Sequence, residues 1–433
     1  MELNIENFAK IKEANIIIDG ITVIAGENNT GKSTVGKILF SIFNSLNNIE
    51  DKILKDRLQT IERRNFLTCV RRTNIEDSQG WEKIQQFVED ISWKIEKELK
   101  NTGRFSDDSL RHVLDGVIRV LTTNFNSADI NIGEELDAIR ENITAVMELS
   151  DDTIIKEIIS SYFNEVFASQ INMLSVEEHG ESVLSLIIKG KTQRLFFEDN
   201  KCTRYEKSIK IDHKAIYIDN PFVVDYLNKL RADANVMENL LVNLLREEKE
   251  DVFDGVVEKM LVKEKMQDIY NRLQTVVEGE IIVDQNDSFC LKNNKFKEPI
   301  ILQNLSTGLK SFVILKLLLE KGGLKEKDVV ILDEPEIHLH PQWQIAYAEL
   351  IVLIQKAFDL SIIVTTHSPY FVDALNLFSC KYGTDSRVNY YLSSNDSNVV
   401  RMECVSDHIE SIYEKMASPI QILDTLRYEL NNK

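Results

Sequence analysis

Short apolar and alternating runs open the chain and predict three strands before any helix. The runs cover 3–8, 14–18 and 21–25, and Asp19-Gly20 between the last two is typical of a two-residue hairpin turn. A loop with two glycines follows, and the apolar positions of 35–43 then recur at helical spacing. The chain therefore begins with strands, a glycine-containing loop and a helix.

The next section, from about residue 44 to 171, is predicted to be helical. Its apolar residues return every three or four positions, first in 81–99 and again in 154–167, which places them on one face of each helix. Strand signals are almost absent. The section is too short for a long coiled-coil arm, so we expect a compact helical insertion.

Strands return after residue 171, and the last third of the chain alternates helices with fully apolar strands. The strands are expected at 183–188, 194–197 (with Gly190 in the turn before it) and 215–218, followed by a helical section over 221–277 and a hairpin of 279–283 and 288–292. The final alternation is typical of a parallel sheet covered on both faces. We therefore predict an α/β fold with a mostly parallel sheet, an N-terminal antiparallel β lobe and a helical insertion.

Composition agrees with a large folded core. Apolar residues make up 43% and charged residues 28% of the chain, with only 16 Gly and 6 Pro, which excludes a disordered or collagen-like protein. The 51 basic and 70 acidic side chains leave a formal charge of −19. Binding of nucleic acid through bulk charge is therefore not expected, although a local basic patch could still bind it.

The cysteines and the first residues indicate the compartment. Cys69, Cys202, Cys290, Cys380 and Cys404 form no Cys-x-x-Cys pair, so we expect neither a disulfide framework nor a zinc knuckle. The opening residues do not resemble a signal peptide, and no apolar run is long enough to span a membrane. We expect a chain of the reducing cytoplasm with no membrane attachment.

Residues 26–33 match the pattern Gly-x-x-x-x-Gly-Lys-Ser in full and follow an apolar strand and precede a helix, as the pattern requires. Inward-pointing N–H groups of such a loop, at a helix N-terminus, cradle phosphate oxygens. Lys32 would add positive charge at the outer phosphates, and the Ser33 hydroxyl would bind Mg²⁺. The residues expected to hold the nucleotide are Gly26, Asn28, Asn29, Thr30, Gly31, Lys32, Ser33 and Thr34.

Two later strands end in side chains suited to phosphate chemistry. The apolar run 329–332 is followed by Asp333 and Glu334, and the run 361–366 is followed by His367. The carboxyl ends of parallel strands meet in the crevice where open α/β sheets bind ligands. There Asp333 would hold Mg²⁺, Glu334 would orient the attacking water, and His367 could reach a γ-phosphate.

The segment 305–310, Leu-Ser-Thr-Gly-Leu-Lys, permits two interpretations. Ser306 is a good N-cap for the apolar helix expected over 309–320, and Gly322-Gly323 is a good end, so the segment can simply be a capped helix. Its serine hydroxyl, Gly308 and N–H groups also suit a second anion site. If both sites edge one sheet, one chain cannot bring this site to its own phosphate loop, whereas two facing chains can.

Together, 26–33, 305–310, 333–341 and 366–369 resemble the ATP-binding-cassette ATPases of the SMC, RecF and OLD branch. The Glu-x-His-x-His-Pro run at 336–341 is similar to OLD-type and Septu-type bacterial defence ATPases in particular. The resemblance implies a P-loop NTPase fold with ATP and Mg²⁺. The roles that it implies are catalysis by Lys32, Glu334 and His367 and metal binding by Ser33 and Asp333.

The resemblance also implies an ATP-sandwich dimer. In such a dimer Ser306 and Gly308 of one subunit bind the γ-phosphate held by the other subunit, and Glu336 and His338 lie in a segment that crosses the interface. The family's glutamine loop has no glutamine here, and Asn220 is the candidate in its place.

In these terms the chain divides into five sections. They are 1–44, the N-terminal part of the ATPase head with the phosphate loop; 45–171, the helical insertion; 172–220, the β lobe; 221–277, a helical section; and 278–433, the C-terminal part of the head.

The chain lacks the signals of a nuclease. OLD nucleases carry a Toprim domain with an Asp-x-Asp pair after the histidine strand, but no such pair follows His367, and no cluster of the HNH type occurs. The isolated histidines His112, His179, His213 and His408 are expected at surface or packing positions. If nucleic acid is cut, we expect a separate nuclease protein to cut it.

A basic cluster lies in the insertion between residues 52 and 72. Its members are Lys52, Lys55, Arg57, Arg63, Arg64, Arg71 and Arg72, among the acidic Asp51, Asp56 and Glu62. The cluster could grip the phosphates of nucleic acid or an acidic partner, or it could be a solvated helix face with local ion pairs.

The sequence thus favours a cytoplasmic, Mg²⁺-dependent ATPase that forms a homodimer or a higher even oligomer around ATP. By resemblance, it is the sensor subunit of an anti-phage defence system that acts with a separate nuclease effector. The alternative is a RecF-like DNA-repair or DNA-end-binding clamp. A cassette subunit of a membrane transporter is disfavoured by the insertion and by the 336–341 run.

Overall fold

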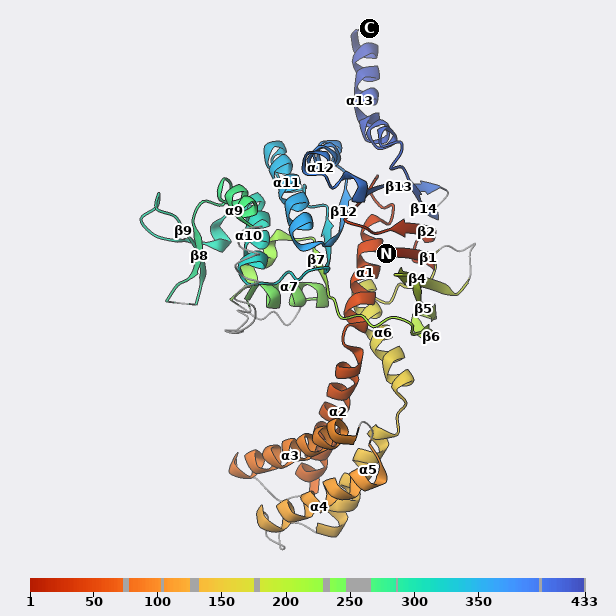
Figure 1. Cartoon of the computed structure of the whole chain (residues 1–433), viewed down its shortest axis with the longest axis vertical. Coiled ribbons are helices and arrows are strands. Elements are labelled where there is room, and N and C mark those ends of the chain that lie inside the picture. The colour runs from red at the N-terminus through yellow and green to blue at the C-terminus, as the bar shows by residue number, and fades with distance from the viewer. Residues whose placement is uncertain are drawn as a thin grey trace. The chain divides into compact units, whose positions relative to one another are not determined.

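The computed structural model describes residues 1–72, 78–102, 105–124, 132–174, 180–228, 234–246, 266–285, 287–396 and 399–431 (Figure 1). Contacts divide the chain into two compact units, which we call the head and the insertion. The head comprises Met1–Asn47 and Ile159–Lys433, and the insertion comprises Asn48–Ile158. The division into five sections, with an insertion over 45–171, stays a prediction, and in the structure residues 159–171 belong to the head.

The head contains a large sheet of eleven strands in the described part of the chain. The strands are β1 Glu2–Phe8, β2 Ile11–Ile17, β3 Ile21–Gly26, β4 Ser182–Ile188, β5 Lys191–Glu198, β6 Lys201–Glu206, β7 Ala215–Ile218, β11 Val329–Asp333, β12 Ser361–Thr366, β13 Val388–Asp396 and β14 Val399–Cys404. Their order is β6-β5-β4-β1-β2-β14-β13-β3-β12-β11-β7. Strands β13, β3, β12, β11 and β7 are parallel, whereas β1, β2, β4, β5 and β6 pair antiparallel with one another. The predicted α/β fold, with a mostly parallel sheet and an antiparallel β lobe, is confirmed.

One predicted hairpin is wrong. Asp19-Gly20 does join β2 to β3, but these strands are not neighbours, because β14 and β13 lie between them. All six residues of β3 are buried, as is typical of a parallel strand covered on both faces, and its neighbours in the sheet are the parallel strands β12 and β13. The hairpin at this end of the chain is instead β1–β2, where Phe8 is paired with Ile11.

Other predicted turns are confirmed. Gly190, with a φ of +75°, closes the β4–β5 hairpin. A separate three-stranded sheet has the order β10-β9-β8, with β8 Glu280–Val283, β9 Phe289–Lys292 and β10 Ile300–Ile301. Its β8–β9 pair is the hairpin expected over 279–292.

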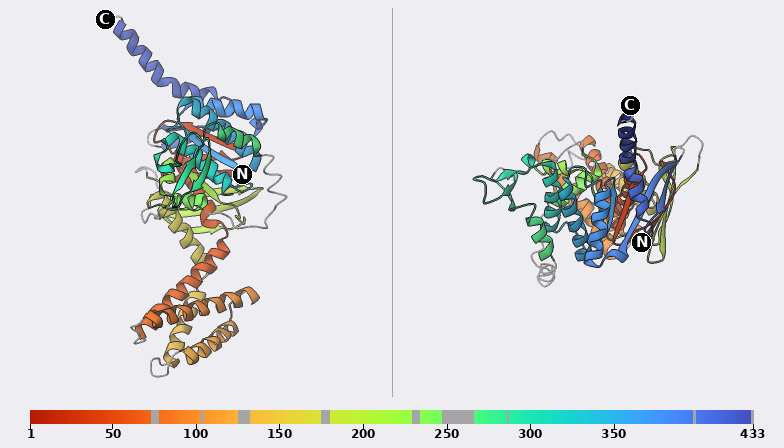
Figure 2. Two further views of the ribbon diagram at one scale, coloured as in Figure 1. Left: turned by 90° about the vertical axis from the view of Figure 1, so that its left-hand side faces the viewer. Right: turned by 90° about the horizontal axis from the view of Figure 1, so that it is seen from above.

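Helices cover both faces of the parallel strands. Helix α1 (Lys32–Leu46) contacts β3, β7, β11 and β12. The apolar core of the other face includes α10 (Thr307–Glu320), α11 (Pro341–Phe358) and α12 (Pro369–Tyr382), and the last two lie side by side (Figure 2). The remaining helical elements of the described head are η1 Pro221–Tyr226, α7 Val236–Arg246, α9 Gln267–Gln274, η2 Leu302–Asn304, η3 Asp385–Arg387 and α13 Glu410–Asn431.

The side chains of strand β11 point alternately to the two helical layers that cover the sheet. Successive side chains of a strand point to opposite faces. Val330 and Leu332 belong to the core with α10 to α12, whereas Ile331 lies against Gly36 of α1. Asp333, two residues after Ile331, is therefore on the side of α1, where the phosphate loop ends.

The insertion is helical in its described residues. Its helices are α2 Ile49–Arg72, α3 Ser78–Thr102, α4 Asp107–Asn124, α5 Ile132–Met147 and the first part of α6 Asp151–Phe167. The predicted apolar face of α3 is buried at Ile84, Phe87 and Ile91. Trp81 was expected on that face but is 42% exposed, and its ring lies beside that of Phe66, with ring centroids 6.0 Å apart. None of the described helices of the chain combines the length and the apolar character needed to cross a bilayer.

Candidate functional site

The phosphate loop joins β3 to α1, and its two glycines have conformations that other residues avoid. Gly26 has a φ of +153°, and a Cβ atom there would lie 2.4 Å from the carbonyl oxygen of Ser393. Gly31 has a φ of +73° and is the N-cap of α1, with no side chain capping the helix. The N–H groups of the first helical turn therefore have no capping side chain, and such a helix start fits a phosphate group.

Contacts from neighbouring segments shape this loop. The Thr30 hydroxyl donates to the Glu27 carbonyl at 2.8 Å, and the Ser393 hydroxyl of β13 donates to the carbonyl oxygen of Thr30. Lys10 Nζ donates to Asn29 Oδ1 at 2.8 Å. The loop conformation is thus held by β13 and by the β1–β2 turn as well as by its own residues.

The tip of the loop is accessible. Asn28 and Asn29 are exposed, and Thr34 is half-buried in the first turn of α1. Lys415 Nζ of α13 lies 3.2 Å from Glu27 Oε1, so a helix far along the chain reaches the loop.

Lys32, Glu334 and His367, predicted from three separate segments, meet in one cluster. Lys32 is buried, and its Nζ lies 2.7 Å from the Glu27 carbonyl oxygen and 3.0 Å from His367 Nε2. Glu334 Oε1 lies 2.7 Å from the same Nε2 atom. Burial lowers the pKa of the Lys32 ammonium group, and nearby carboxylates, above all Glu334, oppose this shift.

Glu334 leaves the sheet with unusual backbone geometry. Its φ is +50°, a left-handed conformation that costs a non-glycine residue about 1 kcal/mol or more. Its N–H group donates to the carbonyl oxygen and the hydroxyl of Thr365, at 3.1 and 3.0 Å. These bonds to the neighbouring strand hold the turn that brings the carboxylate to His367.

The Asp333 carboxylate accepts hydrogen bonds from three hydroxyl groups. Ser33 Oγ donates to Oδ1 at 2.9 Å, and Thr365 Oγ1, which is paired with Asp333 across the sheet, donates to the same oxygen. Tyr217 donates to Oδ2 at 2.6 Å. Burial and the neighbouring Asp333 raise the pKa of Tyr217 well above its ordinary value, so the phenol remains a donor.

Ser33 and Asp333 suit Mg²⁺ when nucleotide is bound. Both offer hard oxygen ligands, which Mg²⁺ prefers, and Mg²⁺ usually takes its other ligands from phosphates and water. The described residues contain no group of three or more His, Cys, Asp or Glu that could hold a metal by itself. The donor set therefore fits a metal that enters with the phosphates.

Glu336 holds the backbone around His367. It is 5% exposed, and its Oε1 accepts from Thr366 Oγ1 at 2.5 Å, from the His367 N–H at 2.8 Å and from the Ser368 N–H at 3.2 Å. Burial raises the pKa of this carboxyl, and the hydrogen bonds oppose the shift. The side chain thus faces its own subunit, and the expected position of this segment in a dimer interface stays a prediction.

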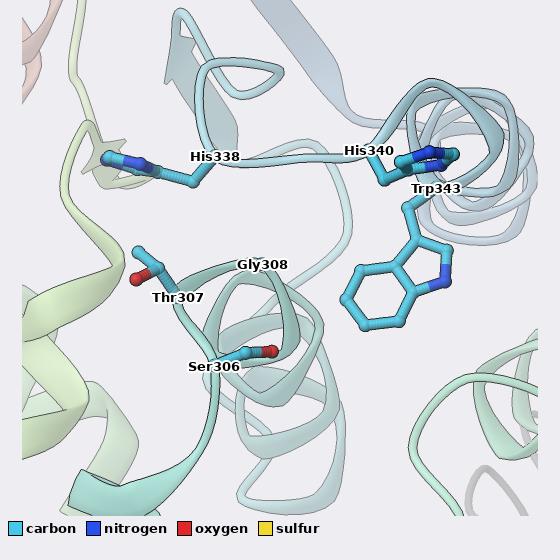
Figure 3. A pocket seen from close by; sticks show the side chains of 6 residues that line it. All are labelled: Ser306, Thr307, Gly308, His338, His340 and Trp343. Atoms are coloured by element: carbon cyan, nitrogen blue, oxygen red, sulfur yellow. The ribbon is translucent and has the colours of Figure 1, made fainter.

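Ser306 and Gly308 lie in a different place from the phosphate loop. They line an open pocket of about 510 Å³ together with Thr307, His338, His340 and Trp343, at the start of α10 (Figure 3). Ser306 accepts a hydrogen bond from the Leu309 N–H at 3.4 Å, which confirms the predicted N-cap. None of Lys32, Glu334 or His367 lines this pocket.

Close packing explains the glycine in this segment. A Cβ atom at Gly308 would lie 2.8 Å from the His338 carbonyl oxygen and 3.1 Å from the Trp343 ring. Lys310, the last residue of the motif, is buried; its Nζ lies 2.6 Å from Asp225 Oδ1 and donates to the Gln303 carbonyl at 3.0 Å. The start of α10 is therefore packed against the segment after β11 and is bonded to η1 and η2.

Asn220 follows the end of β7, and its side chain makes a local hydrogen bond. Its Oδ1 accepts from the Phe222 N–H at 2.9 Å and caps η1. Its role in place of the family's glutamine stays a prediction.

The other predicted residues are scattered. His112 and His213 lie near Glu98 and Asp328, at 3.9 and 3.6 Å, His408 is exposed, and His179 lies outside the described residues. In the basic cluster, Arg57 donates to the Leu149 carbonyl and to Asp151 Oδ1 at 2.5 and 2.8 Å, so it is engaged within the insertion. Lys55, Arg63, Arg64 and Arg71 are exposed.

Reasoning from the sequence missed Tyr217, Thr365 and the inward role of Glu336. The signals were faint. Tyr217 is the polar member of the otherwise apolar run 215–218, and Thr365 is a polar residue at the carboxyl end of a buried strand. A hydroxyl group in a buried strand needs a hydrogen-bond partner, and for both residues that partner is the Asp333 carboxylate.

Comparison with known proteins agrees with this geometry. Residues 1–372 match the AAA ATPase domain family. An alignment 103 positions long shows 36% identity to the Septu protein PtuA of Bacillus thuringiensis; it covers 21% of this chain and about a quarter (25%) of that protein's length.

Two solved structures are also similar. The Smc head bound to the C-winged helix domain of ScpA aligns with 95% of this chain and 98% of its own, at 11% identity and a TM-score of 0.45. The SMC head domain from Thermotoga maritima aligns with 93% of this chain and 98% of its own, at 11% identity and a TM-score of 0.39.

The strand, phosphate loop and helix at 21–46, the acidic strand end at Asp333 and the matched family model lead to one assignment. The chain has a P-loop ATPase fold and belongs to the AAA ATPase domain family.

Proposed function

We propose that this chain hydrolyses ATP in the presence of Mg²⁺. The observation that carries the proposal is the convergence of Lys32, Ser33, Asp333, Glu334 and His367 at the carboxyl ends of three adjacent parallel strands. Each residue type matches one need of phosphoryl transfer: positive charge, metal ligation, water orientation and contact with the transferred phosphate.

Each residue has a distinct role in this proposal. Lys32 and the N–H groups at the start of α1 bind the β- and γ-phosphates, and the exposed loop residues Asn28 and Asn29 border the nucleotide. Ser33 and Asp333 hold Mg²⁺, which when bound neutralises charge on the phosphates. Glu334 orients water for in-line attack, and His367 contacts the γ-phosphate.

We infer that the active form is a homodimer or a higher even oligomer. Ser306 and Gly308 line a pocket that none of the phosphate-loop residues reaches within one chain. A hydroxyl and a close-packed glycine at a helix start suit a phosphate, so a second copy would supply the missing half of each site.

The 103-residue likeness to a Septu protein supports a role in defence against phage. We propose that the chain is the sensor subunit of such a system and controls a separate nuclease. The five cysteines, all described, form no disulfide, which fits work in the cytoplasm.

The exposed Arg63, Arg64 and Arg71 on α2 favour one alternative, a RecF-like clamp on DNA. Copurification separates the two functions: a bound nuclease supports the sensor, whereas DNA recovered without a nuclease, and released by replacing these arginines with glutamate, supports the clamp.

Glu334→Gln tests the catalytic assignment. We expect ATP hydrolysis to fall by about 100-fold or more, with ATP binding retained and the oligomer accumulating with ATP. Glu326→Gln, at an exposed carboxylate before β11, is the control and should hydrolyse ATP normally. Hydrolysis by Glu334→Gln at the wild-type rate would overturn the proposal.

A further inference from the structure

Tyr217 touches the proposed metal site without being part of any recognised motif. Its side chain is 1% exposed, and its hydroxyl lies 2.6 Å from Asp333 Oδ2. Tyr217 pairs with Ile331 across β7 and β11. Because side chains two residues apart in a strand share a face, the ring reaches the carboxylate of Asp333 from the same side of the sheet.

The ring is fixed by the helix that follows the phosphate loop. Phe40 of α1 meets it edge to face, with ring centroids 6.2 Å apart. A Cβ atom at Gly36 would lie 3.2 Å from the tyrosine ring and 2.5 Å from the Ile331 side chain. The absence of a side chain at Gly36 therefore lets α1, which carries Ser33 one turn earlier, lie close against Tyr217.

The two oxygens of Asp333 have different partners. Oδ1 accepts hydrogen bonds from the hydroxyl groups of Ser33 and Thr365, whereas Oδ2 accepts one from the hydroxyl group of Tyr217. Asp333 is half-buried, and without the phenol its Oδ2 atom would lose this hydrogen bond, so the carboxylate would be free to rotate. The phenol thus helps to fix the orientation of the carboxylate, in which one oxygen is directed at Ser33.

We propose that Tyr217 is a positioning residue for Mg²⁺, holding the Asp333 carboxylate with one oxygen directed at Ser33. The inference rests on the proposed ATPase function. Tyr217 itself contacts neither the nucleotide nor the metal; it affects Mg²⁺ binding only through its hydrogen bond to Asp333.

The test measures metal dependence of binding as well as hydrolysis. A fluorescent ATP analogue is titrated with the full chain in EDTA and then with increasing MgCl₂. For Tyr217→Phe we expect affinity in EDTA within twofold of wild type. The Mg²⁺ concentration that gives half of the increase in ATP affinity should rise about 5- to 10-fold, the net effect of one hydrogen bond.

Controls separate positioning from folding. Tyr347→Phe removes a phenol of equal burial on α11, away from Asp333, and should leave the Mg²⁺ midpoint unchanged. In an Asp333→Asn background, Tyr217→Phe should have no further effect, because coupled residues are not additive.

Three outcomes would overturn the inference. An unchanged Mg²⁺ midpoint in Tyr217→Phe, with a normal wild-type response, removes the positioning role alone. Equal weakening in EDTA and in Mg²⁺ shows a structural effect on the nucleotide site instead. A wild-type protein whose nucleotide binding ignores Mg²⁺ removes the proposed function together with this inference.

Discussion

His367 Nε2 lies 2.7 Å from Glu334 Oε1 and, at the same time, 3.0 Å from Lys32 Nζ. One ring nitrogen carries a proton or a lone pair, so it can donate to the carboxylate or accept from the ammonium group, but not both. If a bound γ-phosphate took over the hydrogen bonds of Lys32 Nζ, His367 Nε2 would be bonded to Glu334 alone. We therefore expect the hydrogen bonds of His367 to change when phosphate binds.

We expect His367→Ala to slow ATP hydrolysis about 100-fold while ATP affinity changes by less than threefold. Lys32 and the loop N–H groups remain available to bind phosphates, whereas the contact with the transferred group is lost. Phosphate release and nucleotide binding measure the two effects. His408→Ala, at an exposed position, is the control, and a His367→Ala rate within twofold of wild type would refute the role.

Mixing two inactive variants tests whether sites are shared between subunits. Lys32→Ala and Ser306→Ala should each hydrolyse little ATP. In a mixed dimer one site keeps Lys32 from one chain and Ser306 from the other, so random pairing should restore about a quarter of wild-type activity. A mixture no more active than its parts would mean that each chain works alone.

Glu336 gives a pH-dependent prediction for stability. Its folded-state pKa is raised above the ordinary 4.5 by burial. Between 4.5 and that raised value the folded protein binds more protons than the unfolded chain, so this carboxyl's contribution to stability falls as pH rises. Glutamine keeps the Oε1 acceptor and never ionises.

The Tm of Glu336→Gln relative to wild type should therefore increase as pH rises from 4.5 towards 7. Glu336→Ala should be about 2–4 kcal/mol less stable than Glu336→Gln at every pH, because three donors lose their acceptor and neither replacement ionises. Thermal unfolding measures both. A Tm difference for Glu336→Gln that does not vary with pH would contradict this account.

The fluorescence of Trp343 should allow assembly of the oligomer to be measured. It lines the Ser306 pocket, and the chain has only two other tryptophans, Trp81 and Trp93, both in the insertion. With those two replaced by phenylalanine, adding ATP and Mg²⁺ to a Glu334→Gln background should change the Trp343 emission as the pocket closes against a second copy. The same variant carrying Lys32→Ala should show no change.

Local sequence was sufficient for the parts of the fold that depend on one segment. Buried strands such as 329–332 are apolar throughout, because both faces are covered, and the loop at 26–33 needs its glycines and its lysine wherever it occurs. The site residues from these segments do meet at one edge of the sheet.

Strand neighbours were harder to predict, because pairing depends on segments far apart in sequence. The Asp19-Gly20 turn has hairpin chemistry, yet β3 is occupied on both edges by strands from the last third of the chain. The contact between Tyr217 and Asp333 depends on the register of β7 against β11, which no local pattern encodes.

Charge counting also has a limit. Arg57 belongs to the basic cluster by sequence, but its guanidinium is engaged with Asp151 and with the Leu149 carbonyl. This pairing between helices α2 and α6 occupies the guanidinium of Arg57, whereas Arg63 and Arg64 are exposed.

The pairing of Val23 with Val364 on one side and Tyr390 on the other has a consequence for biogenesis. A ribosome makes β3 and the following loop early, but the strands that flank them emerge only after most of the polypeptide has been translated. The emerging protein cannot close its ATP pocket until then, so nascent fragments should be unable to hydrolyse or respond to nucleotide.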